Sequence, residues 1–480
     1  MERILNYVNG ELIEPVSGKY LQNYEPATGQ IYGEIPDSDS KDVELAISGA
    51  EAAKDSWANT SRQERSDILI KLANIIESRM DEFVIAESRD NGKPEKLARA
   101  VDIPRAVSNL KFFASAILHT ESQFHEMDDI AINYTKRQAI GVVGCISPWN
   151  LPLYLFTWKI APALATGNCV IAKPSEITPF TAYLLSKAAI EAGLPKGVLN
   201  IIHGLGAKVG AAITAAPKIK AISFTGGTAT GKAIAEVAAP MFKKLSLELG
   251  GKNPNIIFND CDFETTLNTA VHSSFANQGQ ICLCGSRIFV QNGIYEKFKK
   301  AFVEKVSKLK VGDPKQSDSN LGAIVSKDHL EKIKYYINLA QEEGGKILTG
   351  GQSPQINGRC KDGYFMRPTI IEGLSYDCRT NQEEIFGPVV TIMPFETEEE
   401  VLKYANSTVY GLASTVWTNN IHTAQNMAEH IDAGIIWINC WLVRDLRTPF
   451  GGMKASGVGR EGGNEALRFF TEPKNVCIKL

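Results

Sequence analysis

The chain has 480 residues, of which 44% are hydrophobic and 22% charged, which is typical of a globular protein large enough for two or three domains. Its formal net charge of −3 argues against a nucleic-acid partner or a polybasic membrane surface, so we expect a small-molecule partner. We find no signal-peptide pattern and no apolar run of membrane-spanning length. Nine cysteines without Cys-x-x-Cys spacing and seven histidines without paired helical spacing predict reduced thiols in a cytoplasmic protein and no metal site.

The first half of the chain alternates between strand and helix patterns. Residues 7–29 show strand-like alternation. Apolar residues recur at helical spacing in residues 42–57, 61–90 and 96–118. Residues 121–137 lose that period and predict a hairpin with little core of its own, which needs partner strands elsewhere. Short apolar runs then alternate with helical segments: runs at 141–148, 168–173, 198–202 and 221–226, helices at 156–165, 178–192 and 206–215.

The second half repeats this alternation. Strands are predicted at residues 254–258, 287–291, 389–393 and 435–439. Helices are predicted at 263–277, 294–309 and 329–343. Strands that alternate with helices indicate βαβ units and parallel sheets, so we expect two α/β domains. Residues 475–480 alternate like an exposed strand.

Two motifs carry residue types that suit acyl chemistry. Cys282, in Gly-Gln-Ile-Cys (279–282), lies between a polar glycine-containing turn and small residues, a setting that can hold a nucleophilic thiol exposed. Glu248 lies in Leu-Glu-Leu-Gly-Gly-Lys-Asn-Pro (247–254), where apolar neighbours would raise its pKa toward the range of a general base. Taken singly, a cysteine is more often an inert core residue and such a glutamate is usually solvated.

Together, in this order and at about this separation, the two motifs resemble the signatures of the aldehyde dehydrogenase superfamily. The resemblance covers essentially the whole chain. It implies an α/β fold with a Rossmann-type NAD-binding domain, an α/β catalytic domain and a small β flap for oligomerisation. We expect these in residues 1–120 with 140–250, residues 251–448, and residues 121–139 with 449–480, respectively. Family members associate through the flap, so a homodimer or homotetramer is implied.

The resemblance also implies chemical roles. Cys282 would add to an aldehyde as a thiolate, because a planar aldehyde carbon cannot expel hydride until a nucleophile makes it tetrahedral. Glu248 would activate water to hydrolyse the resulting thioester. Asn150, in Pro-Trp-Asn-Leu-Pro (148–152), resembles with the Cys282 backbone N–H the family's oxyanion hole. Without the resemblance, Asn150 would be interpreted as an Asx-turn residue. Cys284 is expected to have no chemical role.

No Gly-x-Gly-x-x-Gly fingerprint follows a predicted strand. Instead Phe224, Gly226 and Gly227 begin a segment, residues 224–231, that follows a strand and opens a helix. Glycines there let the backbone approach a pyrophosphate, although a Gly-Gly turn into a helix is usually only a turn. Family members place glycines that pack against the cofactor here, with serine common at the position of Gly227.

A second candidate cofactor segment follows another strand end, where open α/β sheets bind ligands. There Glu176 would accept a hydrogen bond from a ribose 2′-hydroxyl and repel a 2′-phosphate, which favours NAD over NADP. Lys173 would donate to ribose oxygens, and Ser175 lies between the two. The alternative is a surface Lys and Glu pair. The resemblance adds further cofactor contacts: Glu384 at the nicotinamide ribose, Phe386 at the nicotinamide ring, Trp149 on the adenosine side, and Leu249.

Three residues stand where relatives line the substrate tunnel: Arg105, Arg444 and Phe450. A guanidinium that faces a tunnel favours a carboxylate, so two would suit an acidic semialdehyde. The alternative is that each arginine pairs locally with Asp102 or Asp445. Residues 441–452 are similar to dehydrogenases of 2-aminomuconate or 2-hydroxymuconate 6-semialdehyde, which are ring-cleavage products of tryptophan and aromatic catabolism.

Three rival interpretations remain open. The chain could be an aldehyde dehydrogenase for betaine, retinal or aliphatic aldehydes. It could be a non-catalytic NAD-binding or structural protein on the same scaffold, which the presence of Cys282, Glu248 and Asn150 argues against. It could also be a cysteine hydrolase, which is disfavoured because no histidine lies near either motif.

Overall fold

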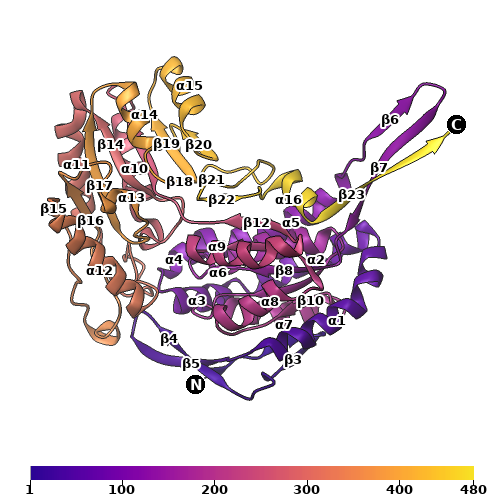
Figure 1. Cartoon of the computed structure of the whole chain (residues 1–480). Helices are drawn as coiled ribbons and strands as arrows, with labels where there is room; N and C mark the ends of the chain where they lie inside the picture. Colours follow the sequence, from indigo (N-terminus) through magenta and orange to yellow (C-terminus); the bar gives the residue numbers. More distant parts are fainter. Residues whose placement is uncertain (1) are drawn as a thin grey trace.

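The computed structural model describes residues 2–480, and its largest sheet has eight strands (Figure 1). Five parallel strands form the centre: β12 (Lys244–Glu248), β11 (Ile219–Thr225), β8 (Val142–Ile146), β9 (Cys169–Lys173) and β10 (Leu199–Ile201). Antiparallel strands close the edges: β22 (Gly457–Val458) on one side, β2 (Asn6–Val8) and β3 (Glu11–Ile13) on the other. β8 and β9 are buried along their whole length, which explains their nearly unbroken apolar sequences.

Helices pack on this sheet in two tiers. The helices in direct contact with the strands are α1 (Ser40–Asn59), α6 (Pro152–Ala165), α7 (Phe180–Ala192), α8 (Ala211–Ala215) and α9 (Thr228–Ala238). Behind α6 and α7 lie α2 (Arg62–Ser78), α3 (Met80–Asn91) and α5 (Ile103–Ala116). Because α6 lies between the sheet and α5, all of its residues are buried. This burial fixes the loop that precedes α6.

The second sheet has seven strands: β15 (Lys346–Thr349), β16 (Thr369–Glu372), β17 (Val389–Phe395), β14 (Gly285–Gln291), β13 (Asn253–Ile257), β19 (Ala413–Trp417) and β20 (Ile435–Ile438). All neighbours are parallel except β15 with β16. Its helices are α10 (Phe263–Phe275), α11 (Tyr295–Ser307), α12 (Lys327–Glu342), α13 (Arg379–Gln382), α14 (Glu398–Asn406) and α15 (Ile421–His430). The two sheets are therefore the cores of two α/β units, as predicted.

Smaller elements complete the fold. β1 (Glu2–Arg3), β5 (Gln30–Pro36) and β4 (Tyr20–Glu25) form one sheet, and β18 (Tyr410–Gly411) pairs with β21 (Met453–Lys454). The predicted hairpin, β6 (Phe124–Met127) and β7 (Ala131–Ala139), finds its partner in β23 (Thr471–Lys479). This three-stranded arm stands away from the body, with the C-terminus toward its tip (Figure 1). Its exposed apolar side chains are those of Phe124, Met127, Ile130, Ile478 and Leu480.

Several boundaries differ from the predictions for local reasons. The helical run predicted at 61–90 is two helices, because Arg79 leaves helical geometry at φ −108° and ψ 30°. The helix predicted at 96–118 consists of α4 (Glu95–Leu97), a π-helical turn at Ala98–Asp102 and α5, which begins next to Pro104. The short α16 (Gly463–Phe469) precedes β23. None of the helices among residues 2–480 combines the length and apolarity needed to cross a bilayer.

The division into domains stays a prediction. Residues 449–480, assigned to the bridging segment, contribute both β23 to the arm and β22 to the edge of the large sheet. β22 pairs directly with Leu247 and Glu248 of β12. The segment therefore reaches the candidate site as well as the arm.

Candidate active site

A cavity of about 230 Å³ lies at the carboxyl ends of β8, β11 and β12, where loops of the second sheet approach them. Eight predicted site residues line it: Trp149, Asn150, Gly226, Gly227, Leu249, Cys282, Glu384 and Phe386. Five residues that were not predicted complete the lining: Pro148, Thr225, Gly250, His329 and Lys332. The other predicted residues lie outside the lining: Arg105, Lys173, Ser175, Glu176, Phe224, Glu248, Arg444 and Phe450.

Cys282 lies on a tight loop between α10 and β14. Asn277, Gln278 and Gly279 have consecutive φ values of 50°, 58° and 70°, so the backbone turns sharply before the cysteine. Asn253 Nδ2 donates to the Cys282 carbonyl oxygen at 2.6 Å and fixes the loop from the second sheet. The sequence led us to expect an exposed thiol, but the residue is half-buried. Burial, with Glu384 and Glu248 nearby, raises the pKa of the thiol above its usual range.

Glu248 is the last residue of β12 and is buried. No residue among those described hydrogen-bonds to its Oε1, and a Cβ on Gly451 would come within 2.7 Å of that oxygen. Burial and the neighbouring Glu461 raise the pKa of Glu248 well above its usual range. The direction of this shift was predicted from the leucines around it. A carboxyl with a raised pKa and an unpaired oxygen is suited to accept a proton near neutral pH.

Asn150 is buried in the loop that leads into α6. Hydrogen bonds hold both its side-chain amide and its backbone carbonyl. Its Nδ2 donates to the Gln280 carbonyl oxygen at 3.0 Å, which leaves the second amide hydrogen free. Its own carbonyl oxygen accepts from Asn277 Nδ2 at 2.9 Å. No acceptor among the described residues takes the backbone N–H of Cys282. Both donors of the expected oxyanion hole are therefore available beside the cavity.

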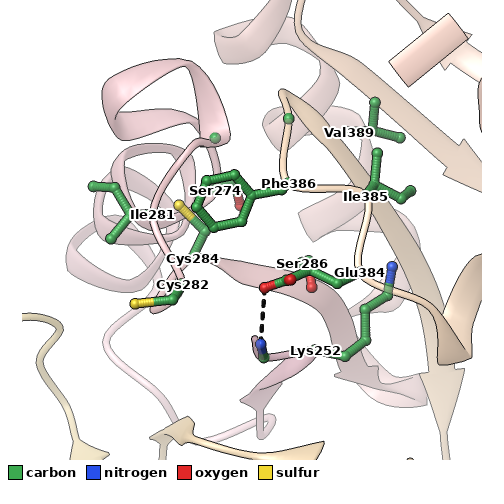
Figure 2. A pocket seen from close by; sticks show the side chains of 13 residues that line it. Lys252, Ser274, Ile281, Cys282, Cys284, Ser286, Glu384, Ile385, Phe386 and Val389 are labelled. Carbon is green, nitrogen blue, oxygen red and sulfur yellow. Dashed lines mark hydrogen bonds between the residues drawn. The ribbon is translucent and has the colours of Figure 1, made fainter. Parts of the chain in front are cut away.

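The glycines after Glu248 bring the two α/β units into close contact. A Cβ on Gly250 would lie 2.4 Å from Glu384 Oε2, and one on Gly251 would lie 2.8 Å from the Cys282 carbonyl oxygen. The Gly251 N–H donates to Glu384 Oε1 at 2.8 Å, the dashed line in Figure 2. Lys252, which the sequence did not single out, is buried in the adjoining pocket (Figure 2), and burial lowers its pKa to about 7. The motif thus places Glu384 against Cys282.

Cys284 is a packing residue in this arrangement. It is buried, and Asn253 Nδ2 donates to its carbonyl oxygen at 2.9 Å. Its sulfur and that of Cys282 point in different directions (Figure 2). Burial raises the pKa of the Cys284 thiol to about 12, which keeps it protonated. The expectation that Cys284 has no chemical role stays a prediction.

Three aromatic rings form one wall of the cavity. The ring centroid of Trp149 lies 5.2 Å from that of Phe386 and 5.0 Å from that of His329. Phe386 has a φ of 62°, and His329 Nε2 lies 2.6 Å from its carbonyl oxygen. The family resemblance assigned Trp149 to the adenosine side of the cofactor and Phe386 to the nicotinamide ring. The two rings are in contact, so Trp149 lies on the same side of the cavity as Phe386. No sequence signal singled out His329, which is brought here by the start of α12.

The second cofactor segment pairs a buried lysine with a half-buried glutamate at the end of β9. Lys173 is only 2% exposed, which contradicts a surface pair, and its Nζ donates to Glu176 Oε2 at 2.8 Å. Glu176 Oε1 accepts from the Gly206 N–H at 3.3 Å, and this contact and Lys173 lower the pKa of Glu176 despite its burial. Ser175 is buried, and its Oγ accepts from the Ile177 N–H at 3.3 Å. Glu176 is thus an ionised acceptor held in place.

In the turn after β11, Gly226 and Gly227 differ in the space that a side chain would have. A Cβ on Gly226 would lie 2.5 Å from the ring of Phe224, so this position requires glycine for steric reasons. A Cβ on Gly227 would meet nothing within 4 Å, and Gly227 precedes α9 without a side-chain cap. Leu249 packs beneath this helix against Gly231, where a Cβ would lie 2.5 Å from it. The N–H of Gly226 donates to the Glu248 carbonyl oxygen at 3.0 Å, whereas the first N–H groups of α9 have neither an intrahelical acceptor nor a side-chain cap from the described residues.

The guanidinium of Arg444 lies between two aromatic rings, 3.8 Å from the centroid of Phe450 and 4.3 Å from that of Trp158. Its Nη1 donates to Tyr154 Oη at 2.7 Å, whereas its buried Nη2 has no hydrogen-bond partner among the described residues. Tyr154 is also near Arg105, whose guanidinium carbon Cζ lies 5.8 Å from the centroid of the Tyr154 ring. Tyr154 and Trp158 were missed, although they follow Asn150 at intervals of four residues on one helical face.

The alternative of local ion pairs for these arginines is excluded by the partners of the two aspartates. Asp102 Oδ1 accepts from Lys93 Nζ at 2.6 Å. Asp445 Oδ2 accepts from Arg447 Nη2 at 2.6 Å. Among residues 2–480, neither Arg105 nor Arg444 has a carboxylate within ion-pair distance. A negatively charged group from outside the chain would therefore complete the site.

Comparisons with known proteins agree with this geometry. The aldehyde dehydrogenase family model matches residues 13–476. The 2-aminomuconic semialdehyde dehydrogenase of Danio rerio is 50% identical over 480 residues, covering 99% of this chain and 98% of the relative. The 2-hydroxymuconic semialdehyde dehydrogenase of Pseudomonas sp. (strain CF600) is 43% identical, covering 100% of both. The NAD+ complex of an aldehyde dehydrogenase from Bacillus cereus superposes with a TM-score of 0.97 at 38% identity, covering 100% of this chain and 97% of that one. The chain belongs to the aldehyde dehydrogenase family.

Proposed function

We propose that the protein oxidises an aldehyde to a carboxylic acid with NAD, through a thiohemiacetal and a thioester on Cys282. The observation that carries this proposal is that Cys282 and Asn150 line one cavity from two separate α/β units, with the buried Glu248 near enough to raise the pKa of the Cys282 thiol. A non-catalytic scaffold has no need for a buried carboxyl with an unpaired oxygen near a half-buried thiol, because the unpaired carboxyl costs folding free energy.

The residues of the chain fit NAD at this cavity. Gly226 and Gly227 leave the start of α9 open to a pyrophosphate, and the ionised Glu176 would accept from a ribose 2′-hydroxyl. Glu384 would hold the nicotinamide ribose, while Phe386 with Trp149 would support the ring. Bound NAD supplies the hydride acceptor. Because the Glu176 carboxylate would repel a 2′-phosphate, NAD is favoured over NADP.

The side chains then divide the chemistry between them. The Cys282 thiol has a raised pKa, so it must lose its proton as the sulfur attacks the aldehyde carbon, and the Glu248 carboxylate is the proposed acceptor. The Asn150 amide and the Cys282 backbone N–H would stabilise the alkoxide; such a donor is worth about 3 to 4 kcal/mol. After hydride departure leaves a thioester, Glu248 would first release the thiol proton to solvent. It would then take a proton from the water that attacks the thioester carbon, and cleavage of the C–S bond would free the carboxylic acid and the Cys282 thiolate.

The substrate class follows from the two unpaired arginines. We infer an aldehyde with a distal carboxylate, such as 2-aminomuconate or 2-hydroxymuconate 6-semialdehyde, the substrates named for the relatives that are 43 to 50% identical. The buried Arg444 Nη2 would bind the carboxylate and Arg105 would assist. A betaine-type cation would be repelled there. An aliphatic or retinal chain would leave the guanidinium unpaired, at a cost of several kcal/mol if desolvated.

The oligomer and the compartment are further proposals. The arm of β6, β7 and β23 exposes Phe124, Met127, Ile478 and other apolar side chains, which a homodimer or homotetramer would cover. All nine cysteines are free thiols, which supports a reducing compartment such as the cytoplasm.

The test is turnover of 2-hydroxymuconate 6-semialdehyde with NAD, followed as NADH absorbance beside a neutral aldehyde of similar length. We expect NADH with both and a higher kcat/KM for the acidic substrate. NADH only with neutral or cationic aldehydes would replace the substrate proposal. No NADH with any aldehyde would favour the non-catalytic alternative or a cysteine hydrolase.

A further inference from the structure

The backbone of the Asn150 loop is held by an unusual number of side-chain donors. The Asn150 carbonyl oxygen accepts from Asn277 Nδ2 at 2.9 Å, Lys93 Nζ at 3.2 Å and Asn91 Nδ2 at 3.3 Å. Asn91 Nδ2 also donates to the Trp149 carbonyl oxygen at 2.9 Å. A carbonyl oxygen has two lone pairs, so three donors are more than its hydrogen-bonding capacity requires. They fix the orientation of the peptide plane.

Lys93 is the charged member of this set, and it belongs to a cluster that is closed to solvent. The side chains of Lys93, Glu87 and Asp102 are all 0% exposed. Lys93 Nζ lies 2.6 Å from Asp102 Oδ1 and 3.7 Å from Glu87 Oε1. The other Glu87 oxygen accepts from the Leu153 N–H at 3.3 Å, at the start of α6. The cluster therefore holds the loop on both sides of Asn150.

Stability alone does not account for this cluster. The desolvation of buried ions offsets most of their mutual attraction, so apolar residues of similar volume stabilise a core as well or better. Glu87 Oε1 and Asp102 Oδ2 have no hydrogen-bond partner among the described residues, which adds to the cost. The cluster does fix the orientation of the Asn150 carbonyl, because Lys93 Nζ bonds both to that carbonyl oxygen and to Asp102. Asp102 lies three residues before Arg105.

We propose that Lys93 is a positioning residue for the reaction: through the Asn150 carbonyl oxygen it fixes the side-chain amide that stabilises the alkoxide. This inference rests on the proposed function, in which Asn150 is that donor. One amide hydrogen of Asn150 is committed to the Gln280 carbonyl oxygen, so the peptide plane at residue 150 sets where the other one points. A donor shifted by a fraction of an ångström loses much of its effect on a transition state.

The test variant pairs Lys93→Met with Asp102→Asn. Lys93→Met alone would leave Asp102 as an unpaired buried charge and endanger the fold. Glu87 needs no replacement, because burial raises its pKa to about 8 and it is neutral at pH 7 without the lysine. A second pair, Lys93→Gln with Asp102→Asn, retains polar contacts between the two side chains. Lys96→Met is the matched control, since Lys96 is exposed and donates to the Ser317 carbonyl oxygen at 2.8 Å outside the cluster.

We expect the paired variant to keep its melting temperature near that of the wild type, with KM and the Kd for NAD within about twofold. Its kcat should fall about 10- to 100-fold, less than the 10²- to 10³-fold that loss of an oxyanion donor costs. In an Asn150→Ala background the same pair of changes should lower kcat less than about threefold, because no amide remains to be positioned. Lys96→Met should have wild-type kinetics.

Three results would overturn the proposal while the wild type remains active. One is an unchanged kcat in the paired variant, and another is a loss of kcat that multiplies with that of Asn150→Ala, which indicates a general structural role. The third is failure of both pairs to fold, which would make Lys93 a residue for stability only. By contrast, a wild-type enzyme that forms no NADH would refute the proposed function itself, so the two failures are distinguishable.

Discussion

Replacement of Arg444 by methionine would isolate the contribution of its guanidinium to substrate choice. The side chain is held between the rings of Trp158 and Phe450, and Nη1 is occupied by Tyr154 Oη at 2.7 Å. The buried Nη2 is therefore the group left for a substrate carboxylate. Methionine has a similar length and remains compatible with both rings, so the pocket should stay folded.

The expected magnitude follows from one charge-assisted hydrogen bond. Such a bond contributes about 1.5 to 3 kcal/mol, which corresponds to roughly a 10- to 150-fold change in kcat/KM for the acidic aldehyde. The charge of Arg444 also lowers the pKa of Glu248 and of Cys282 against the effect of burial. Loss of this charge should therefore also lower the kcat/KM for a neutral aldehyde. The informative quantity is the ratio of the two kcat/KM values.

The assay measures kcat/KM for 2-hydroxymuconate 6-semialdehyde and for a neutral aldehyde of similar length. Arg444→Lys, which keeps the charge but not the planar fork, should lower the ratio less than Arg444→Met. Arg105→Met should also have a smaller effect. The matched control is Arg447→Met, an exposed arginine paired with Asp445, and it should leave the ratio within about twofold. Equal losses on both substrates in Arg444→Met would refute the carboxylate contact.

Three further predictions follow from buried or half-buried carboxyls. Glu248→Gln should lower kcat by about 10²- to 10⁴-fold and remove the rise of kcat with pH that a general base with a raised pKa gives; a variant that keeps the wild-type pH profile would contradict its role. Glu176→Gln should raise the kcat/KM for NADP relative to NAD about fivefold, since it removes roughly 1 kcal/mol of repulsion; an unchanged ratio would place the ribose elsewhere. Asp90, buried with a pKa raised to about 7 from 3.8, favours folding most below pH 4, and this contribution, about 4 kcal/mol, is lost as the pH rises through 7. Denaturant titrations of Asp90→Asn should therefore show a flatter fall of the unfolding free energy between pH 4 and 7, and an identical slope would contradict the shifted pKa.

Much of the fold could be predicted because burial leaves its mark on sequence. β8 and β9 have nearly unbroken apolar sequences because both faces are covered, and the alternation of such runs with helical periods implies parallel sheets. The break between α2 and α3 could not be found this way. Arg79 is neither glycine nor proline, and the apolar period continues across it.

The candidate site could be predicted only where its residues share a motif. Gly250 and Gly251 lie just after Glu248 and Leu249, and side chains at the two glycines would collide with Glu384 and with Cys282. One run of sequence therefore records two close contacts between the α/β units as well as the candidate base. His329 had no such signal, since it comes to the cavity from the first turn of another helix.

Pairing of charges was likewise beyond the sequence. Asp102 lies three residues from Arg105, yet its partner is Lys93, because both side chains are buried and face the Asn150 loop. The exposure of Cys282 also depends on tertiary context, since Asn253 and Glu384 reach it from other strands and loops. Local spacing alone does not carry that information.

The central claim is that the Cys282 sulfur becomes bonded to the aldehyde carbon before hydride departs. The most direct measurement is mass spectrometry of the protein quenched during turnover with NAD and aldehyde, with Cys282→Ser and Cys284→Ser in parallel. We predict an acyl adduct on Cys282 in the wild type and in Cys284→Ser, and neither an adduct nor NADH formation in Cys282→Ser. An enzyme that turns over without any adduct at residue 282, together with a Cys282→Ser variant of full activity, would contradict the account.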